Sequence, residues 1–260
     1  MTAAFPLERM GEFKIPMVEP LSLPVTSVVL ETRPEMMGRI RAITEWHRKW
    51  FRFAREVIVS VSDPQIPGTF FCPCPAPPLG EMAALWYSDF CVKWVDRLCD
   101  SDFVLLWQWD GFIVNPELWT GEFMRYDYVG APVVSDYWRA SCEWLVVNKP
   151  GWRIPPNLEY PIVGNGGFSL RSKRFVSTTA GIPIGTGSWL ARNEDQYLCL
   201  EMREELENGG IKFCSPSLAK RFSKDEGDTR PIGECFGFHD VTHMQEVKEA
   251  LESKYVGVGT

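Results

Sequence analysis

The hydrophobic positions in the first half of the chain alternate between strand-like runs and helix-like spacings. Continuous apolar runs of strand length occur at residues 25–32, 57–61 and 103–109, and such runs are typical of buried strands. Between them, apolar residues recur at every third or fourth position from Met37 to Phe53 and over about residues 79–99, which predicts two amphipathic helices. The βαβαβ order predicts an α/β fold with a parallel sheet and right-handed crossovers.

The second half of the chain has a weaker pattern of shorter elements. Residues 133–160, like residues 62–80 before them, are rich in Pro and are predicted to be irregular. The pattern contains no repeat and no second core, so it predicts one domain over residues 25–260, preceded by an extended arm at residues 1–24. The short elements predicted in this half are helices at 117–123, 173–178, 193–206 and 242–254, a strand that closes at Gly130 and a strand at 212–215.

The third apolar run delivers a carboxylate at its end. The run Val-Leu-Leu-Trp from Val104 is followed by Gln108 and then by Asp110. Open α/β sheets bind their ligands at the carboxyl ends of parallel strands, so Asp110 is a candidate to bind a metal ion or a nucleotide. The alternative is that Asp110 only caps a turn at Gly111. The chain has no G-x-G-x-x-G and no G-K-[ST] motif after its first strand, which argues against classical dinucleotide and P-loop sites.

Composition narrows the classes of partner. With 45% apolar and 23% charged residues among 260, the chain is globular, and its formal charge of −7 argues against non-specific binding to nucleic acid or to an anionic membrane. Eight Cys without a C-x-x-C pair predict reduced thiols and no zinc site. Because neither a signal peptide nor a membrane-spanning run is found, we expect a cytoplasmic protein that meets any membrane-derived acceptor peripherally.

Four features follow one another along the chain, and each has a functional and a structural interpretation. Asp110 and His239 would supply a carboxylate and an imidazole to a divalent cation, although a lone His is also common in a packed core. Three glycines in Gly164-Asn-Gly-Gly167 allow either close approach to a ligand or a tight turn. Glu194-Asp195 opens a helix, where acidic residues suit the dipole, and a carboxylate there could also act as a general base.

In this order, the features resemble those of glycosyltransferases with the GT-A fold. The D-x-D-like metal motif, the glycine-rich acceptor loop, the x-E-D motif and the C-terminal metal-ligand His of that fold match Gln108-Trp-Asp110, Gly164-Asn-Gly-Gly167, Asn193-Glu-Asp195 and His239. Asp127-Tyr-Val-Gly-Ala-Pro, Val163-Gly-Asn-Gly-Gly-Phe-Ser-Leu-Arg and Phe236-Gly-Phe-His look like a small glycosyltransferase-like family catalogued mainly as a domain of unknown function. The close resemblance covers about residues 80–240. It implies a single GT-A-like (Rossmann-like) domain with a central, mainly parallel mixed sheet flanked by helices.

The resemblance also implies a nucleotide-diphosphate sugar as the donor. Residues 25–110 would form the nucleotide-binding half, and Asp110 and His239 would hold Mn²⁺ or Mg²⁺ on the pyrophosphate. Gln108 stands where the wider fold has its first Asp, which leaves dependence on the metal open. The donor site implied in this way consists of Thr32, Arg33, Gln108, Asp110 and Lys220.

The acceptor, a hydroxyl of a glycan or glycoconjugate, would then lie in the half formed by residues 111–260. Asp195 would be the catalytic base of an inverting single displacement, and Glu194 would orient the sugar or the backbone. Aromatic side chains of the irregular segment would stack on acceptor sugars, or would only pack that segment. The acceptor site implied in this way consists of Gly164, Asn165, Gly166, Gly167, Trp138 and Trp152.

Two other functions remain open from the sequence. One is a non-catalytic module of the same fold that binds a nucleotide or a sugar, which Gln108 makes worth considering. The other is a nucleotidyltransferase, which also places a carboxylate-bound metal after a central strand. The Gly- and Lys-rich N-terminal loop typical of nucleotidyltransferases is not found in this chain.

Overall fold

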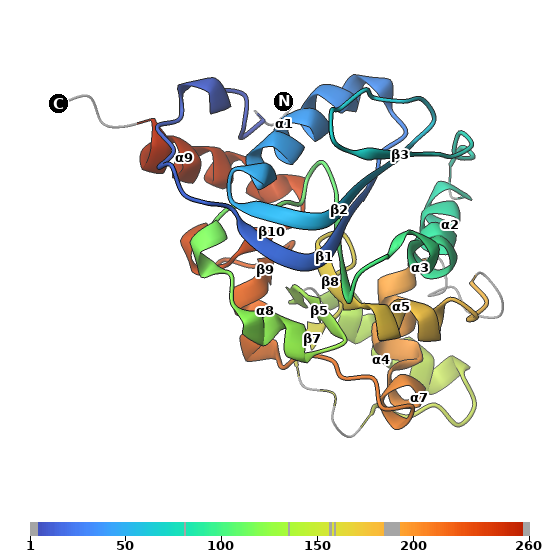
Figure 1. Cartoon of the computed structure of the whole chain (residues 1–260). Coiled ribbons are helices and arrows are strands. Elements are labelled where there is room, and N and C mark those ends of the chain that lie inside the picture. Colours follow the sequence, from blue (N-terminus) through green and yellow to red (C-terminus); the bar gives the residue numbers. More distant parts are fainter. Residues whose placement is uncertain are drawn as a thin grey trace.

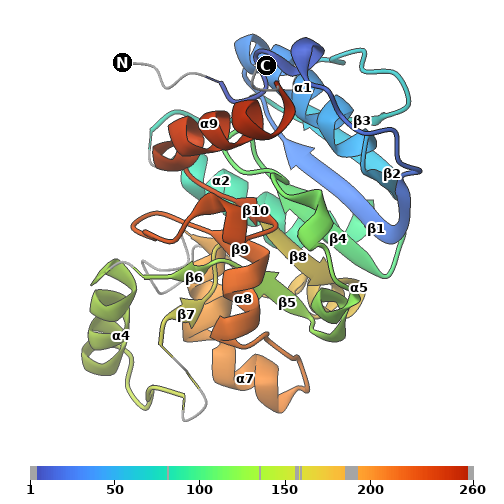
Figure 2. The same cartoon turned by 90° about the vertical axis from the view of Figure 1, so that its left-hand side faces the viewer.

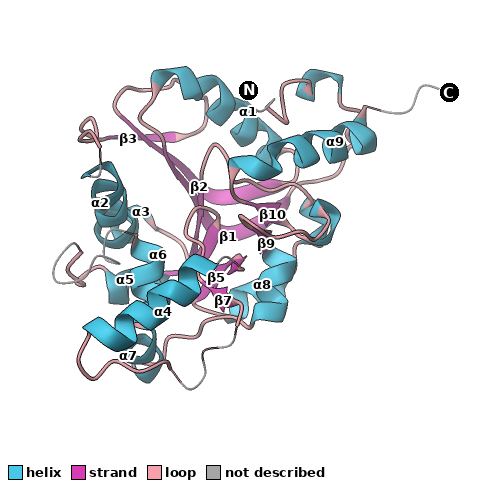
Figure 3. Ribbon diagram, turned by 180° about the vertical axis from the view of Figure 1, so that it is seen from behind, coloured by secondary structure: helices cyan, strands magenta, loops and turns pink. Residues whose placement is uncertain are grey.

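The computed structural model describes residues 5–80, 82–134, 136–155, 158, 160–184 and 193–256. A twisted central sheet runs through the molecule, with helices on both sides of it (Figures 1 and 3). No helix in these described segments is both long and apolar enough to cross a lipid bilayer.

The central sheet has six strands in the order β3-β2-β1-β4-β8-β5. The first four strands are parallel to one another, β8 is antiparallel to both β4 and β5, and β1 pairs with β2 from Leu21 opposite Phe51. This arrangement confirms the predicted fold class, an α/β domain with a central, mainly parallel mixed sheet flanked by helices. The strands are β1 (Leu21–Leu30), β2 (Phe51–Ser60), β3 (Phe70–Pro73), β4 (Phe103–Trp107), β5 (Tyr128–Gly130) and β8 (Ser169–Ser172).

Helices cover both faces of this sheet. One group, α1 and α9, lies on one side, and α2, α3 and α5 lie on the other (Figure 3). The Trp46 ring of α1 meets the Tyr255 ring of α9 at a centroid distance of 5.5 Å, which joins the two ends of the chain. The helices are α1 (Met37–Arg48), α2 (Met82–Asp89), α3 (Val95–Leu98), α4 (Asp136–Asn148), α5 (Lys173–Thr179), α6 (Glu194–Gln196), α7 (Arg203–Asn208), α8 (Pro216–Phe222) and α9 (Met244–Tyr255).

Two small sheets complete the second half of the molecule. β9 (Ser223–Lys224) pairs in parallel with β10 (Gly237–Phe238), and β6 (Pro132–Val133) pairs antiparallel with β7 (Ile162–Val163). In Figure 2, β9 and β10 lie below α9 and beside the end of the central sheet. This position brings the segment after β10 close to the end of β4, because Ile113 forms an isolated bridge with Gly237.

Several predicted boundaries differ from the structure. The helix predicted to reach Phe53 ends at Arg48, since β2 begins at Phe51 and pairs with β1. Apolar residues spaced for one more helical turn therefore became the start of a buried strand. The predicted loop over 62–80 contains β3, a short edge strand, and residues 212–215 form only an isolated bridge at Phe213.

The segment over 133–160, predicted to be irregular, contains the thirteen-residue helix α4. Its prolines gave a misleading signal, because Pro150 and Pro155 follow the helix. The N-terminal arm is also more ordered than its prolines indicate. β1 begins within it at Leu21, and Phe13 stacks on Tyr255 of α9 with ring centroids 5.9 Å apart.

Candidate active site

Two adjoining clefts open at the carboxyl ends of β1 and β4. We call them the Asp195 cleft, with a volume of about 210 Å³, and the Arg33 cleft, with a volume of about 300 Å³. Tyr87 and Gln108 line both clefts and form the wall between them. The Asp195 cleft is lined by Ala84, Tyr87, Ser88, Gln108, Asn165, Gly166, Gly167, Asn193, Glu194, Asp195, Gln196 and His239, and the Arg33 cleft by Leu30, Glu31, Thr32, Arg33, Pro77, Ala83, Trp86, Tyr87, Gln108 and Trp109.

The position of these clefts follows from strand direction. Parallel strands bring their carboxyl ends to one edge of the sheet, where ligands bind in open α/β folds. The strand β8 is antiparallel, so its starting end, which follows Gly167, lies at that same edge. Gln108 and Gly167 are more than fifty positions apart in the chain, and both therefore lie at this edge of the sheet.

Gln108 lies at the start of a tight turn directly after β4. The backbone N–H and C=O groups of Gln108 and Gly111 bond to each other at 3.1 Å in both directions, which leaves Trp109 and Asp110 at the tip. The side-chain Nε2 of Gln108 donates to the hydroxyl of Tyr87 at 2.7 Å, and its Oε1 lies 3.1 Å from Nε2 of His239. Both the nitrogen and the oxygen of the Gln108 side-chain amide therefore have a hydrogen-bond partner.

Asp110 does not cap the turn. The N–H of Gly111 donates to the carbonyl of Gln108, and Oδ1 of Asp110 is buried without a hydrogen-bond partner in the part of the chain that the structure describes. Burial raises the pKa of Asp110, while the nearby charge of His239 opposes that shift. An unpaired buried carboxylate oxygen is costly, and it is the kind of atom that a bound cation satisfies.

His239 lies in the site and not in the core. The parallel pairing of β10 with β9 carries it there, and its N–H donates to the carbonyl of Lys224 at 2.8 Å. Nδ1 of its ring lies 3.1 Å from Oδ1 of Asp225 and 3.0 Å from Nδ2 of Asn165. Burial alone lowers the pKa of His239, but its hydrogen bond to Asp225 and the charges of Asp225 and Asp110 raise it to about 9.

The glycine loop is required for close approach and not for a turn. A Cβ added to Gly167 would overlap the His239 ring, and one added to Gly166 would lie 2.5 Å from Oε1 of Glu194. Neither glycine has a positive φ, so any residue could adopt their backbone conformation. Of the two interpretations left open by the sequence, the structure supports close approach, here to other side chains of the site.

Asp195 is held by the backbone. Its Oδ2 accepts from the N–H of Gly166 at 3.1 Å and its Oδ1 from the N–H of Gln196 at 2.7 Å. Burial, and then the charge of Glu194, raise the pKa of Asp195 to about 7. A carboxylate with a pKa near the working pH is suited to accept a proton from a substrate.

Glu194 faces a buried partner. Its Oε1 accepts from Nη2 of Arg171 at 2.8 Å, and both side chains are about 95% buried or more. Its backbone N–H donates to Oγ of Ser88 at 3.1 Å. Arg171 is a residue of β8, so its ion pair with Glu194 connects the start of α6 to the central sheet.

The remaining predicted residues fall into two groups. Thr32 and Arg33 line the Arg33 cleft, where Arg33 forms two hydrogen bonds to the buried carboxylate of Glu31, at 2.8 and 2.7 Å. Five others lie outside the lining of both clefts: Asp110, Gly164, Trp138, Trp152 and Lys220.

Trp138 is a clear correction. It was predicted to stack on an acceptor sugar, but its ring packs under Gly164 and the residue is only 4% exposed. Nε1 of Trp152 donates to the carbonyl of Glu201 at 3.2 Å, which holds that ring against the adjacent helical turn. Lys220 lies on α8. The aromatic content of this region reflects packing around α4.

Three important residues were not predicted as site residues, although Arg171 ends the glycine-containing motif that begins at Val163. Tyr87 falls within an amphipathic helix, Asp225 within a polar loop, and Arg171 within a short strand. Each acquires its place only through a contact with a residue distant in the chain, at Gln108, His239 or Glu194 respectively. Only an isolated charge in a buried strand, as at Arg171, could have drawn attention.

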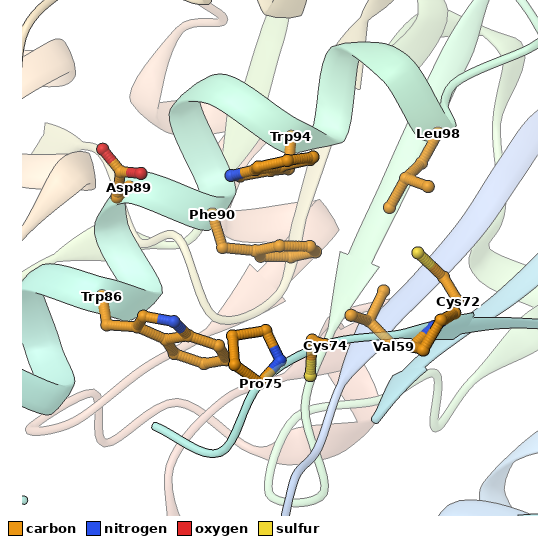
Figure 4. A pocket seen from close by; sticks show the side chains of 10 residues that line it. Val59, Cys72, Cys74, Pro75, Trp86, Asp89, Phe90, Trp94 and Leu98 are labelled. Atoms are coloured by element: carbon orange, nitrogen blue, oxygen red, sulfur yellow. The ribbon is translucent and has the colours of Figure 1, made fainter. Parts of the chain in front are cut away.

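A third, apolar cavity adjoins the Arg33 cleft through Trp86. It has a volume of about 220 Å³ and lies between the helical segment that begins with α2 and the strand β3 (Figure 4). The rings of Trp86, Phe90 and Trp94 line its helix side, and Cys72 and Cys74 its strand side (Figure 4). Trp86 thus lines both the Arg33 cleft and this apolar cavity.

Asp110 and His239 would be the residues to hold a divalent cation in this site. Within the described part of the chain, no three His, Cys, Asp or Glu side chains come together as a metal-binding group. Oδ1 of Asp110 is buried without a hydrogen-bond partner among these residues. Both ring nitrogens of His239 have partners, Nε2 at Gln108 and Nδ1 at Asp225 and Asn165, so a cation bound to Nε2 would replace its contact with Gln108. A cation held here would need a further neutral oxygen ligand.

Comparison with known proteins identifies the family of the chain. The family model described as "Protein of unknown function (DUF5672)" matches residues 87–239, more than half of the chain. No curated protein matches it.

Among solved structures, a glycosyltransferase involved in glycosylation of the major capsid of PBCV-1 is 11% identical, covering 88% of this chain and 98% of that chain with a TM-score of 0.47. Galactosyltransferase LgtC in complex with donor and acceptor sugar analogues is 10% identical, covering 88% and 96% with a TM-score of 0.45. Core-mannan synthase A (CmsA/Ktr4) from Aspergillus fumigatus, in a Mn/GDP form, is 8% identical, covering 60% and 61% with a TM-score of 0.37. Likeness at this level leaves the activity of this chain open.

Proposed function

We propose that this chain, which belongs to the family described as protein of unknown function (DUF5672), is a glycosyltransferase. It would move a sugar from a nucleoside-diphosphate sugar to a hydroxyl group of a glycan or glycoconjugate. One observation carries the proposal: a carboxylate with a pKa of about 7, Asp195, shares a cleft with Gln108 and His239, and a second cleft opens beside it. In this proposal the two clefts would supply a base, a site for the leaving group and a site for the nucleotide, one beside the next.

The donor nucleotide would occupy the Arg33 cleft. Its volume of about 300 Å³ is in the range of small-molecule sites, and Trp86 and Trp109 offer flat apolar surfaces for a base or ribose. Arg33 lies there with its guanidinium held by Glu31 and carries the donors to bind a phosphate. The diphosphate would then pass the wall formed by Tyr87 and Gln108 and bring the sugar into the Asp195 cleft.

Asp110 and His239 would hold a divalent cation on the diphosphate. When bound, the cation neutralises negative charge that develops on the leaving group. The buried, partnerless oxygen of Asp110 fits that role, and Gly167 leaves the space that the His239 ring needs.

Asp195 would be the catalytic base. Its carboxylate takes the proton from the acceptor hydroxyl as that oxygen bonds to the anomeric carbon. The bond between the anomeric carbon and the diphosphate breaks in the same step, and the nucleoside diphosphate leaves. Attack from the face opposite the leaving group inverts the configuration. Glu194 does not reach for the proton, since Arg171 holds it; it anchors the start of α6.

The test is Asp195→Asn, compared with Asp102→Asn at an exposed position outside both clefts. Nucleoside diphosphates would first be screened by thermal shift, with and without Mn²⁺, and the nucleotide-sugars of those that stabilise the protein would then be assayed for release of nucleoside diphosphate. Loss of general base catalysis costs about 10²- to 10⁴-fold, so Asp195→Asn should lose turnover by that amount and keep its affinity for the nucleoside diphosphate. Asp102→Asn should keep both.

Two results would contradict the proposal. Failure of every nucleoside diphosphate to stabilise the protein would remove the donor site. Near-normal turnover in Asp195→Asn would remove the base. Binding of a nucleoside diphosphate with no turnover of any nucleotide-sugar would favour the non-catalytic module, and turnover of a nucleoside triphosphate with a sugar phosphate would favour a nucleotidyltransferase.

A further inference from the structure

A further cavity shares no lining residue with the Asp195 cleft or the Arg33 cleft. It has a volume of about 240 Å³, and its lining comes mainly from α7 and from residues 213–216, which lead into α8. We call it the Arg203 cavity. The side chains that line it are Tyr126, Leu158, Val163, Arg203, Glu207, Phe213, Cys214, Ser215 and Pro216.

Arg203 has an incomplete set of hydrogen bonds in this cavity, although the residue is only 7% exposed. Its Nε donates to Oε1 of Glu207 at 2.7 Å, and its Cζ lies 3.8 Å from the centre of the Phe213 ring. Nη1 is buried without a hydrogen-bond partner among the described residues. Arg171, which is also buried, donates through two of its nitrogens to other side chains. A buried donor without an acceptor costs free energy, so a ligand that brings an oxygen to Nη1 would recover that cost.

The charges around the cavity favour an uncharged ligand. Arg203 and Glu207 are the ionic side chains of its lining, and they have opposite charges. Two more acids, Glu204 and Glu205, lie in the first turn of α7. These carboxylates would repel an anion, and the guanidinium of Arg203 would repel a cation. A neutral ligand avoids both costs.

The polar atoms of the lining suit a ligand with neighbouring hydroxyl groups. A guanidinium only donates and a carboxylate only accepts, whereas a hydroxyl does both. One hydroxyl of such a ligand can accept from Arg203 while the next donates to Glu207. The hydroxyls of Tyr126 and Ser215 can take either role, and the ring of Tyr126 adds an apolar surface for C–H groups.

We propose that the Arg203 cavity binds an uncharged sugar unit of a glycan. A sugar ring is a small neutral polyol, and a volume of about 240 Å³ lies just below the range of about 300–1,000 Å³ typical of sites for larger ligands. The site goes beyond the proposed function, because binding here needs neither a nucleotide nor transfer at Asp195. It would hold a glycan by a unit other than the one that reacts.

The test is the binding of free sugars to the whole chain without nucleotide, followed by saturation-transfer difference NMR. The panel consists of glucose, galactose, mannose and N-acetylglucosamine, with glucuronate as a sugar that carries a carboxylate. At least one neutral sugar should bind. Glucuronate should bind at least about tenfold more weakly than the best neutral sugar, because the acids of α7 oppose its charge.

Two substitutions probe the two ionic side chains of the cavity. Arg203→Lys keeps the charge but loses the planar set of donors. It should weaken binding of the neutral sugar by about tenfold or more, because a hydrogen bond to a charged group is lost. Glu207→Gln removes the negative charge and keeps an acceptor oxygen, so glucuronate should now bind at least as tightly as the neutral sugar. The Glu207 side chain is 25% exposed, which makes Glu207→Gln the variant less expected to disturb folding.

Matched controls are available on the surface. Arg97→Lys changes an exposed Arg of α3. Glu249→Gln changes an exposed Glu of α9 that accepts from Gln245, one helical turn away. Neither should change sugar binding, and thermal melting would show that each variant is folded.

Four results would decide against the inference. Binding of no sugar in the panel would show that the cavity holds water only. Unchanged binding in Arg203→Lys would place the sugar elsewhere, as in the Asp195 cleft. Glucuronate as the best ligand of the wild type, or no gain for glucuronate in Glu207→Gln, would overturn the choice of an uncharged unit. Failure of every nucleoside diphosphate to bind would instead refute the proposed function and leave this inference in place.

Discussion

The two carboxylates proposed to act in the site, Asp195 and Asp110, differ in their hydrogen-bond partners. Both oxygens of Asp195 accept backbone N–H groups, from Gly166 and Gln196. Asp110 has a buried oxygen with no hydrogen-bond partner. Burial raises the pKa of both groups, so the difference lies in what completes each carboxylate.

This difference indicates two kinds of site. On the Asp195 side, both carboxylate oxygens have backbone hydrogen-bond donors. The neighbouring Glu194 forms a buried ion pair with Arg171. On the Asp110 side, Oδ1 is buried without a hydrogen-bond partner among the described residues, which fits the cation proposed for it. A base must be in place before chemistry begins, whereas a cation can arrive with the diphosphate. We therefore expect substitutions on the Asp195 side to lower stability and the rate of turnover, and substitutions on the Asp110 side to weaken donor binding.

The largest effect should come from breaking the ion pair under Asp195. Arg171→Met leaves the Glu194 carboxylate buried without its partner, which typically costs about 3–5 kcal/mol of unfolding free energy. Urea denaturation followed by Trp fluorescence would measure it, with Arg174→Met, an exposed Arg of α5, as the control. Adding Glu194→Gln to Arg171→Met should recover most of the loss. A single variant as stable as the wild type would show that the Asp195 side is not supported in this way.

The next effect concerns the packing of His239 on the glycine loop. Gly167→Ala places a methyl group where the ring lies, so the imidazole must move. Displacement of a site group by about 1 Å can cost about 10²-fold in activity, and we expect that loss in turnover together with weaker Mn²⁺ binding. Gly233→Ala, where an added Cβ meets nothing within 4 Å, is the control. If Gly167→Ala left Mn²⁺ binding unchanged, His239 would not be a ligand.

A smaller effect is the dependence of turnover on pH. Since Asp195 must be ionised to act as a base and its pKa is raised to about 7, turnover should fall about tenfold for each pH unit below 7 and level off above it. Initial rates at saturating donor and acceptor between pH 5.5 and 8.5 would show the profile. A rate that does not change with pH across that interval would show that Asp195 is not a base with a raised pKa.

The smallest effect is a gain in stability. The pKa of Asp110 is raised by burial, so the folded protein binds a proton on this carboxylate more tightly than the unfolded chain does. The free energy of unfolding therefore falls as the pH rises from below the ordinary pKa of Asp to above the raised pKa of Asp110. Asp110→Asn should therefore raise the melting temperature in EDTA at pH 8, by the equivalent of about 1 kcal/mol or less, with no gain at pH 4. A lower melting temperature at pH 8 would mean that attraction to His239 outweighs burial, and that the Asp110 side is complete without a cation.

Much of the candidate site could be read from the order of motifs. Gln108, the glycines at 166 and 167, Asp195 and His239 were all predicted, and the structure brings them to one cleft. Their roles in catalysis and in metal binding stay predictions until the experiments above are done. Trp138 was placed wrongly, because an aromatic residue in a Pro-rich segment has the same signal whether it packs inside or lies on the surface.

The limits of the sequence pattern have physical causes. Trp50 and Phe53 continue a helical spacing, but Trp50 lies in the turn after α1 and Phe53 lies in β2, since the pairing of β2 with β1 overrides the local preference. The short strand β3 is too brief to show alternation, and it forms because β2 offers it an edge. Periodicity describes a segment alone, and these segments take their conformation from neighbours.

The sequence by itself determined the α/β class, because the long apolar runs and helical spacings of the first half allow few other arrangements. The order of motifs also predicted Gln108, Gly166, Gly167, Asp195 and His239 as site residues, and the structure brings these five into one cleft. Only the tertiary structure decided how they are supported. Tyr87 beside Gln108, Asp225 beside His239 and Arg171 beside Glu194 are contacts between distant segments, and no local pattern encodes a contact whose two halves meet only when the sheet has formed.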